Sequence, residues 1–147
     1  MEINFVLSLP RDAASVWIVR HLCGDALARI GVQPGCIHDI QLAITEACTN
    51  VLQHAHGKRD QYEVKLRVEG RTALISVSDA GVGLDPSIDR RGPADSAESG
   101  RGILLMNNLV DHLRFVSKRE TGTIVHLEKV LELTDASILH KLSFSAA

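Results

Sequence analysis

Apolar and polar residues alternate from Glu2 to Leu9, and this period of two predicts a β-strand that ends at Pro10. The apolar residues that follow recur at helical spacing. They predict a first helix from Asp12 to about Ile30, closed by Gly31, and a second helix from Gly35 to about His56.

The period of two returns after the second helix. Apolar residues alternate with charged ones from Tyr62 to Val68, and Gly70-Arg71 makes a tight turn into the segment from Ala73 to Asp79. The two segments should form a β-hairpin with one face in water. From Ala80 to Gly100 the chain is rich in Gly, Pro, Asp, Ser and Arg, which predicts a long loop of the kind that is usually functional.

Helical spacing resumes from about Arg101 to His112, and two further strands follow, Leu113 to Ser117 and Thr123 to Val130. The order of elements predicts a two-layer α/β sandwich, in which three helices cover one face of a mainly antiparallel mixed sheet. We expect one domain over residues 1–130 and a C-terminal tail, 131–147, that this pattern does not place.

The composition is that of a globular protein with an aliphatic core: of 147 residues 45% are hydrophobic, 23% charged and only 3% aromatic. The net charge of −2 gives no indication of nucleic-acid binding, and no apolar run approaches the roughly 20 residues that span a bilayer. The first residues lack the pattern of a signal peptide. Cys23, Cys36 and Cys48 lack metal-ligand spacing, so we expect buried free thiols in a reducing cytoplasm.

The first of four candidate motifs lies on the second helix, where Glu46 and Asn50 are four residues apart and therefore share a face. A carboxylate and a carboxamide one turn apart suit a hard cation or a polarised water. Such pairs are also common on helix surfaces without any ligand.

The second motif begins at Asp79, which continues the apolar register of its strand and so should be buried. A buried carboxylate needs hydrogen-bond donors, and the exocyclic amine of a purine would be one. Gly81 and Gly83 follow and let the backbone approach a flat ligand closely. The alternative is an aspartate that caps its own turn.

The third motif, Gly100-Arg101-Gly102, is expected to open the third helix, with Ser99 as N-cap. Free backbone N–H groups and the helix dipole there favour phosphate, and Arg101 adds positive charge, although glycines at helix starts are commonplace. The fourth motif is Gly122-Thr123. The hydroxyl of Thr123 should point inward, unless the residue simply serves a hairpin turn.

Together and in this order, the motifs closely resemble those of the GHKL ATPase superfamily, and the resemblance covers about Glu2 to Val130. It implies the Bergerat-type ATP-binding fold with a mobile lid. The segment from Glu46 to Ala55 is most similar to the anti-sigma-factor serine kinases of bacterial partner-switching systems. The four matching segments are the N-box, Glu46-Ala47-Cys48-Thr49-Asn50, the two glycine boxes, Asp79-Ala80-Gly81-Val82-Gly83 and Gly100-Arg101-Gly102-Ile103, and the terminal box, Thr121-Gly122-Thr123.

The resemblance implies roles for single residues. Asn50 would coordinate Mg²⁺ at the phosphates, and Glu46 would orient or deprotonate the attacking serine hydroxyl. Asp79 would bind the adenine amine, assisted by Thr123 through a water. The remaining positions would make room for the base or hold the phosphates: Gly81, Gly83, Gly100, Arg101 and Gly102.

In function, the resemblance implies a cytoplasmic serine-protein kinase that binds ATP and Mg²⁺, sequesters a sigma factor and phosphorylates a STAS-type antagonist protein. It also suggests a homodimer. The alternative is a non-catalytic ATP-binding module that regulates through protein–protein contact. A third alternative, the catalytic half of a histidine kinase, needs a helical pair with a phosphoacceptor histidine before Glu2, and so is expected only if the sequence is a fragment of a longer protein. The lid from Leu84 to Ser99 departs from the family by being short, which puts its closure in question.

Overall fold

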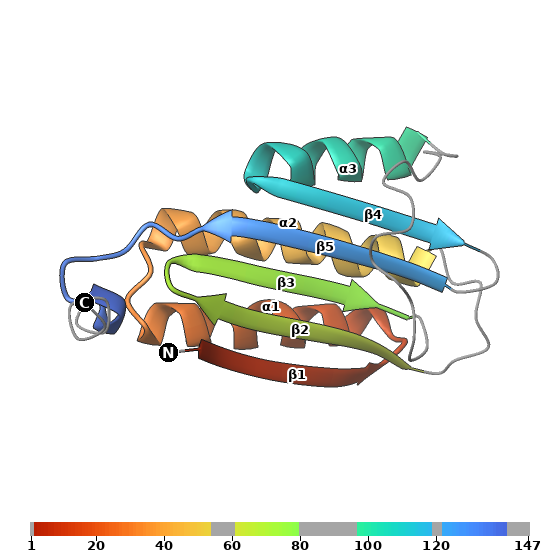
Figure 1. Cartoon of the computed structure of the whole chain (residues 1–147). Helices are drawn as coiled ribbons and strands as arrows, with labels where there is room; N and C mark the ends of the chain where they lie inside the picture. The colour runs from red at the N-terminus through yellow and green to blue at the C-terminus, as the bar shows by residue number, and fades with distance from the viewer. Residues whose placement is uncertain (1, 54–60, 80–96, 119–121, 141–147) are drawn as a thin grey trace.

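A five-stranded sheet with three helices on one face makes up this computed structural model, which describes residues 2–53, 61–79, 97–118 and 122–140 (Figure 1). The helices α1, α2 and α3 span Ala13–Arg29, Pro34–Gln53 and Ala97–Leu109. The strands, in the spatial order β1-β2-β3-β5-β4, are β1 (Glu2–Pro10), β2 (Gln61–Glu69), β3 (Thr72–Ser78), β5 (Gly122–Val130) and β4 (His112–Lys118).

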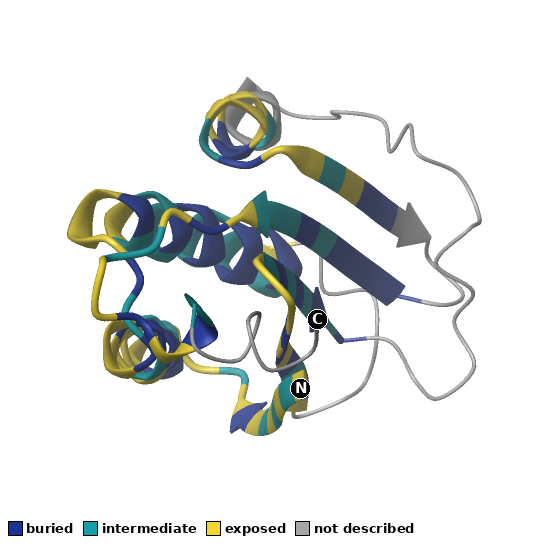
Figure 2. Cartoon of the chain, turned by 60° about the vertical axis from the view of Figure 1, so that its left-hand side comes forward, coloured by how far each residue is buried: buried dark blue, intermediate teal, exposed yellow. Residues whose placement is uncertain are grey.

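The predicted two-layer sandwich is confirmed. All four strand pairings in the described residues are antiparallel, so the parallel component of the expected mixed sheet is not found among them. Figure 2 shows that the helices turn their buried sides toward the sheet.

The hairpin of β2 and β3 follows the predicted alternation. Glu69 pairs with Thr72 across the two-residue turn Gly70-Arg71, and Gly70 has a φ of 58°, in the left-handed region that glycine adopts at little cost. On the helix-facing side of the two strands the residues are buried: Tyr62, Val64, Leu66, Val68, Ala73, Ile75 and Val77.

The helix α2 occupies the centre of the helical layer, between α1 and α3. A fully buried stripe at helical spacing packs it into the core: Ile40, Ala43, Ile44, Ala47 and Val51. Glu46 and Asn50 lie beside this stripe, on the flank toward α3. The position of both residues therefore follows from the packing of the helix.

The predicted start of the third helix is wrong. The helix α3 begins at Ala97, about one turn before Arg101, so Ser99 lies within the helix and is not its N-cap. Gly102, which is buried, lets α3 lie directly against Glu46 and Asn50 of α2. Tertiary packing thus outweighs the low intrinsic helix propensity of the two glycines in this segment.

The first part of the C-terminal tail packs against the connection between α1 and α2. The Thr134 amide donates to Gly31 O at 2.8 Å, and Ser137 Oγ donates to Ile30 O at 2.5 Å. Leu131 and Leu139 are buried there. Residues 131–140, which the sequence pattern did not place, therefore cover one end of the helical layer.

The three cysteines are free and buried, as predicted: Cys23, Cys36 and Cys48. Within the described part of the chain, no helix has the length and apolar character needed to cross a membrane.

Candidate functional site

Asp79 directly follows β3 and keeps the buried register of that strand, with only 3% of the residue exposed. Its backbone N–H donates to Thr123 O at 3.1 Å, and the Thr123 N–H donates to Asp79 Oδ1 at 2.6 Å. Thr123 is fully buried. The predicted burial of the carboxylate and the inward position of Thr123 are both confirmed.

Arg11, which the sequence did not single out, is the second donor to this carboxylate. Its Nη1 lies 3.0 Å from Asp79 Oδ2. Its Nη2 donates to the backbone oxygens of Val51 at 3.2 Å and Leu52 at 3.3 Å, near the C-terminal end of α2. A cation is favoured at that end of a helix. The guanidinium therefore links the β1–α1 connection, α2 and the end of β3.

A hollow of about 280 Å³ lies between α2 and α3. It brings together four of the predicted site residues. The lining consists of Glu46, Thr49, Asn50, Gln53, Arg101, Gly102 and Leu105. No role had been predicted for Thr49, which lies within the N-box segment, or for Gln53. Thr49 stands three residues after Glu46, and Gln53 three residues after Asn50, so both share this flank of α2.

The lining of this hollow fits a magnesium-bound phosphate. Asn50 is 3% exposed, yet its Nδ2 has no hydrogen-bond partner among the described residues, which is costly for a buried amide. The amide nitrogen suits a phosphate oxygen, and the amide oxygen suits Mg²⁺. In the described part of the chain no cluster of three or more His, Cys, Asp or Glu could hold a metal ion.

Gly102, which has no side chain, lets the backbone of α3 lie close to the side chains of Glu46 and Asn50. A Cβ there would lie 3.0 Å from Glu46 Oε2 and 3.3 Å from Asn50 Nδ2. The unpaired amides of α3 belong to its first turn from Ala97, so the free N–H groups expected at Arg101 and Gly102 are engaged in the helix. Gly100 lies in that first turn, whereas Gly81 and Gly83 fall outside the described residues.

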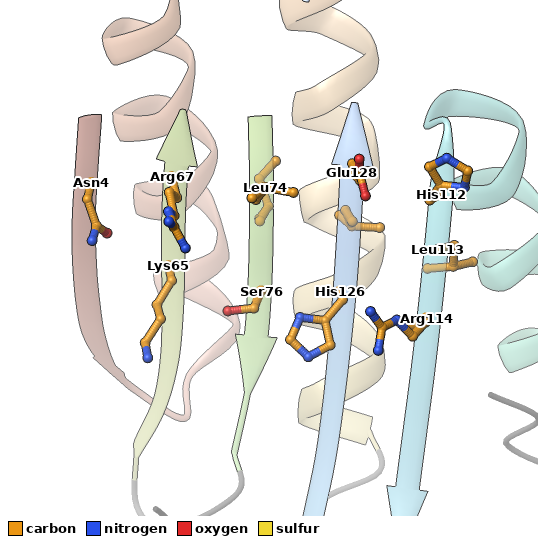
Figure 3. Close-up of a pocket in the computed structure, with 12 residues that line it drawn as sticks. Asn4, Lys65, Arg67, Leu74, Ser76, His112, Leu113, Arg114, His126 and Glu128 are labelled. Atoms are coloured by element: carbon orange, nitrogen blue, oxygen red, sulfur yellow. The ribbon is translucent and has the colours of Figure 1, made fainter. Parts of the chain in front are cut away.

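A second and larger hollow, of about 380 Å³, crosses the sheet face opposite α1, α2 and α3 (Figure 3). Its polar and charged side chains come from all five strands, and they include Lys65, Arg67, Arg114 and His126. Burial lowers the pKa of His126, and the positive charges of Arg114 and Lys65 lower it further. No residue of the four predicted motifs lines this hollow.

Comparison with known proteins agrees with this geometry. The model of the histidine kinase-like ATPase domain family matches residues 9–129. The serine-protein kinase RsbW of Bacillus thuringiensis is 31% identical over 138 residues, which cover 86% of this chain and 84% of that protein. RsbW of Halalkalibacterium halodurans is 28% identical over 135 residues, 86% of this chain and 82% of that protein.

A solved structure has the same fold. The crystal structure of the RsbU and RsbW domains of a Mycobacterium tuberculosis protein matches with a TM-score of 0.67 at 22% identity and covers 88% of this chain. The match takes in 32% of that longer polypeptide. The family model and the RsbW relatives together show that the chain belongs to the family of histidine kinase-like ATPase domains.

Proposed function

We propose that this protein is a serine-protein kinase of the cytoplasm that uses ATP and Mg²⁺, sequesters a sigma factor and phosphorylates a STAS-type antagonist. The names of the RsbW relatives support kinase activity. The observation that carries the proposal is the hollow between α2 and α3, where Glu46 borders Gly102 beside Asn50. The buried amide nitrogen of Asn50 has no hydrogen-bond partner among the residues that the structure describes.

The nucleotide would extend from the end of β3 to this hollow. The carboxylate of Asp79 would accept a hydrogen bond from the adenine amine, while Thr123 holds Oδ1 through its backbone N–H. Gly81 and Gly83 would leave room for the base. Asn50 would bind Mg²⁺, and the bound ion would neutralise charge that develops on the phosphates.

Phosphotransfer would take place beside Glu46. Its carboxylate accepts the proton of a partner's serine hydroxyl as the hydroxyl oxygen attacks the γ-phosphorus and ADP leaves. Arg101 and Gly102 line the hollow. Arg101 would add positive charge near the transferred group, and Gly102, together with the neighbouring Gly100, would permit close approach of the phosphates. A homodimer is part of this proposal and rests on the family resemblance alone.

The test is transfer of radiolabel from γ-labelled ATP to a STAS-type protein purified with the kinase. Glu46→Gln keeps shape and hydrogen bonding but removes the base, so transfer should fall by about 10²–10⁴-fold while ATP binding persists. Glu128→Gln makes the same chemical change beside the hollow on the opposite face of the sheet and should leave transfer unchanged.

Two results would replace parts of the proposal. Wild-type protein that transfers no label, although ATP alters its binding to the partner, would identify a non-catalytic ATP-binding module. Transfer by Glu46→Gln at the wild-type rate would assign the base to another residue.

A further inference from the structure

We propose that Arg11 is a positioning residue of the nucleotide site, which holds Asp79 in place for the adenine amine and ties it to the end of α2. This inference rests on the proposed nucleotide site. It gives a role to Arg11, a partly buried arginine bonded to Asp79 that neither the motifs nor the family resemblance include.

Two hydrogen-bond donors hold the Asp79 carboxylate. An ionised carboxylate offers about four lone-pair sites. The Thr123 N–H occupies one on Oδ1 and Arg11 Nη1 occupies one on Oδ2, so the two oxygens are fixed in orientation while acceptor capacity remains for a ligand donor. The side chain of Asp79 is fully buried. Without Arg11, the Thr123 N–H would be its one remaining hydrogen-bond donor among the residues that the structure describes.

Arg11 is itself anchored on α2. The side chain is only 14% exposed, and its Nη2 donates to two backbone oxygens of α2, those of Val51 and Leu52. The guanidinium therefore need not leave when a nucleotide arrives. It acts as a fixed donor to Asp79 rather than as a competitor of the adenine amine.

Arg11 also connects the two ends of the proposed nucleotide site. Val51 and Leu52 directly follow Asn50, the proposed Mg²⁺ ligand, and Asp79 is the proposed adenine acceptor. Because one guanidinium bonds to both α2 and Asp79, it sets their relative position. A lysine cannot replace it, since one ammonium lacks the planar fork that spans a carboxylate and two carbonyls.

The test compares two nucleotides by calorimetry, ADP and purine riboside 5′-diphosphate, which carries hydrogen in place of the 6-amino group. Wild-type protein should prefer ADP. Arg11→Met should lower the affinity for ADP by about 10- to 100-fold, the usual effect of losing a hydrogen bond to a charged group. It should lower the affinity for the purine analogue much less, so that most of the preference for ADP disappears.

Two further variants separate the outcomes. Arg67→Met removes an exposed arginine from the opposite face and should change neither affinity. Arg11→Lys should lie between wild type and Arg11→Met, and it carries the test if Arg11→Met fails to unfold cooperatively. Folded Arg11 variants that lose affinity equally for both nucleotides, or that keep the ADP preference, overturn the positioning role. Wild-type protein that binds neither nucleotide overturns the proposed nucleotide site itself.

Discussion

Among single residues, Gly102 shows how a missing side chain can shape a site. It packs against Glu46 and Asn50, the two residues of α2 that are proposed to handle the phosphates. No other residue type leaves this space, because a Cβ would already press on both side chains.

Gly102→Ala should therefore impair phosphotransfer more than folding. The added Cβ would lie 3.0 Å from Glu46 Oε2 and 3.3 Å from Asn50 Nδ2, so both side chains must move by a small fraction of these distances. Because a displacement of about 1 Å in a catalytic site can cost up to about 10²-fold in rate, this smaller shift should lower transfer by up to about 10-fold. The melting temperature should stay the same or rise, because alanine favours a helix by about 1 kcal/mol over glycine. Label transfer and thermal denaturation measure the two effects.

Gly35→Ala provides the control. Gly35 also lies in a helix, but a Cβ there meets no atom within 4 Å. This variant should keep full transfer. Full transfer by Gly102→Ala as well would remove the contact between Gly102 and Glu46 from the proposed mechanism.

At the scale of elements, the sequence predicts best where one period controls burial. The alternation of apolar and polar residues in β2 and β3 predicted the extent of both strands, the side that is buried and the burial of Asp79. It does so because a strand that slips by one residue exposes its whole apolar side. The predicted start of α3 was wrong because Ser99, Gly100 and Gly102 have the local preferences of a helix end, whereas the helix in fact begins at Ala97 and packs against α2 at Gly102.

Arg11 could not have been identified in the same way. Its partner Asp79 is 68 residues away in the chain, and β1 and β3 are not neighbours but lie on either side of β2. Only the assembled sheet and α2 bring the guanidinium to the carboxylate. The four motifs, in contrast, were visible because their residue types recur at short spacing within one element or turn.

The connection between α1 and α2 should be sensitive to substitution. Gly31 has a φ of 88°, and a Cβ there would lie 2.6 Å from Ser137 Cα of the tail. Gly31→Ala should cost the roughly 1–2 kcal/mol of a left-handed residue and, in addition, displace the tail.

Gly70→Ala measures the backbone contribution alone, so the difference between the two variants gives the contribution of the tail contact. Gly70 has a φ of 58°, and no atom lies within 4 Å of a Cβ placed there. This variant should therefore lose only the unfolding free energy that a left-handed backbone conformation costs alanine. Urea denaturation compares the two. Equal losses of unfolding free energy would mean that the tail does not pack on Gly31.

For the whole molecule, the free energy of unfolding should fall at alkaline pH, because the core holds two thiols and a phenol in their uncharged forms. Burial raises the pKa of Cys23 and Cys48 from 9.0 to about 12, and burial raises that of Tyr62 from 10.0 to about 12. These groups ionise at lower pH in the unfolded chain than in the folded protein. Their contribution to the free energy of unfolding is therefore complete below about pH 9 and is lost as the pH rises toward 12.

The measurement is the free energy of unfolding by urea at several pH values from 8 to about 11. Each thiol should contribute a slope of about 1.4 kcal/mol per pH unit once it is ionised only in the unfolded state. The double variant Cys23→Ala with Cys48→Ala will be less stable throughout, but its slope should be smaller. An unchanged slope would show that these thiols do not titrate differently in the two states.

The central claim is that a nucleotide binds with its adenine at Asp79 and its phosphates between α2 and α3. Calorimetric titration with ATP and Mg²⁺ of wild type and Asp79→Asn tests it most directly, because the amide presents donors where the adenine amine needs an acceptor. We predict that wild type binds and that the variant, shown by its melting curve to be folded, loses about 2 kcal/mol or more of binding free energy. Wild-type affinity in folded Asp79→Asn would contradict the claim.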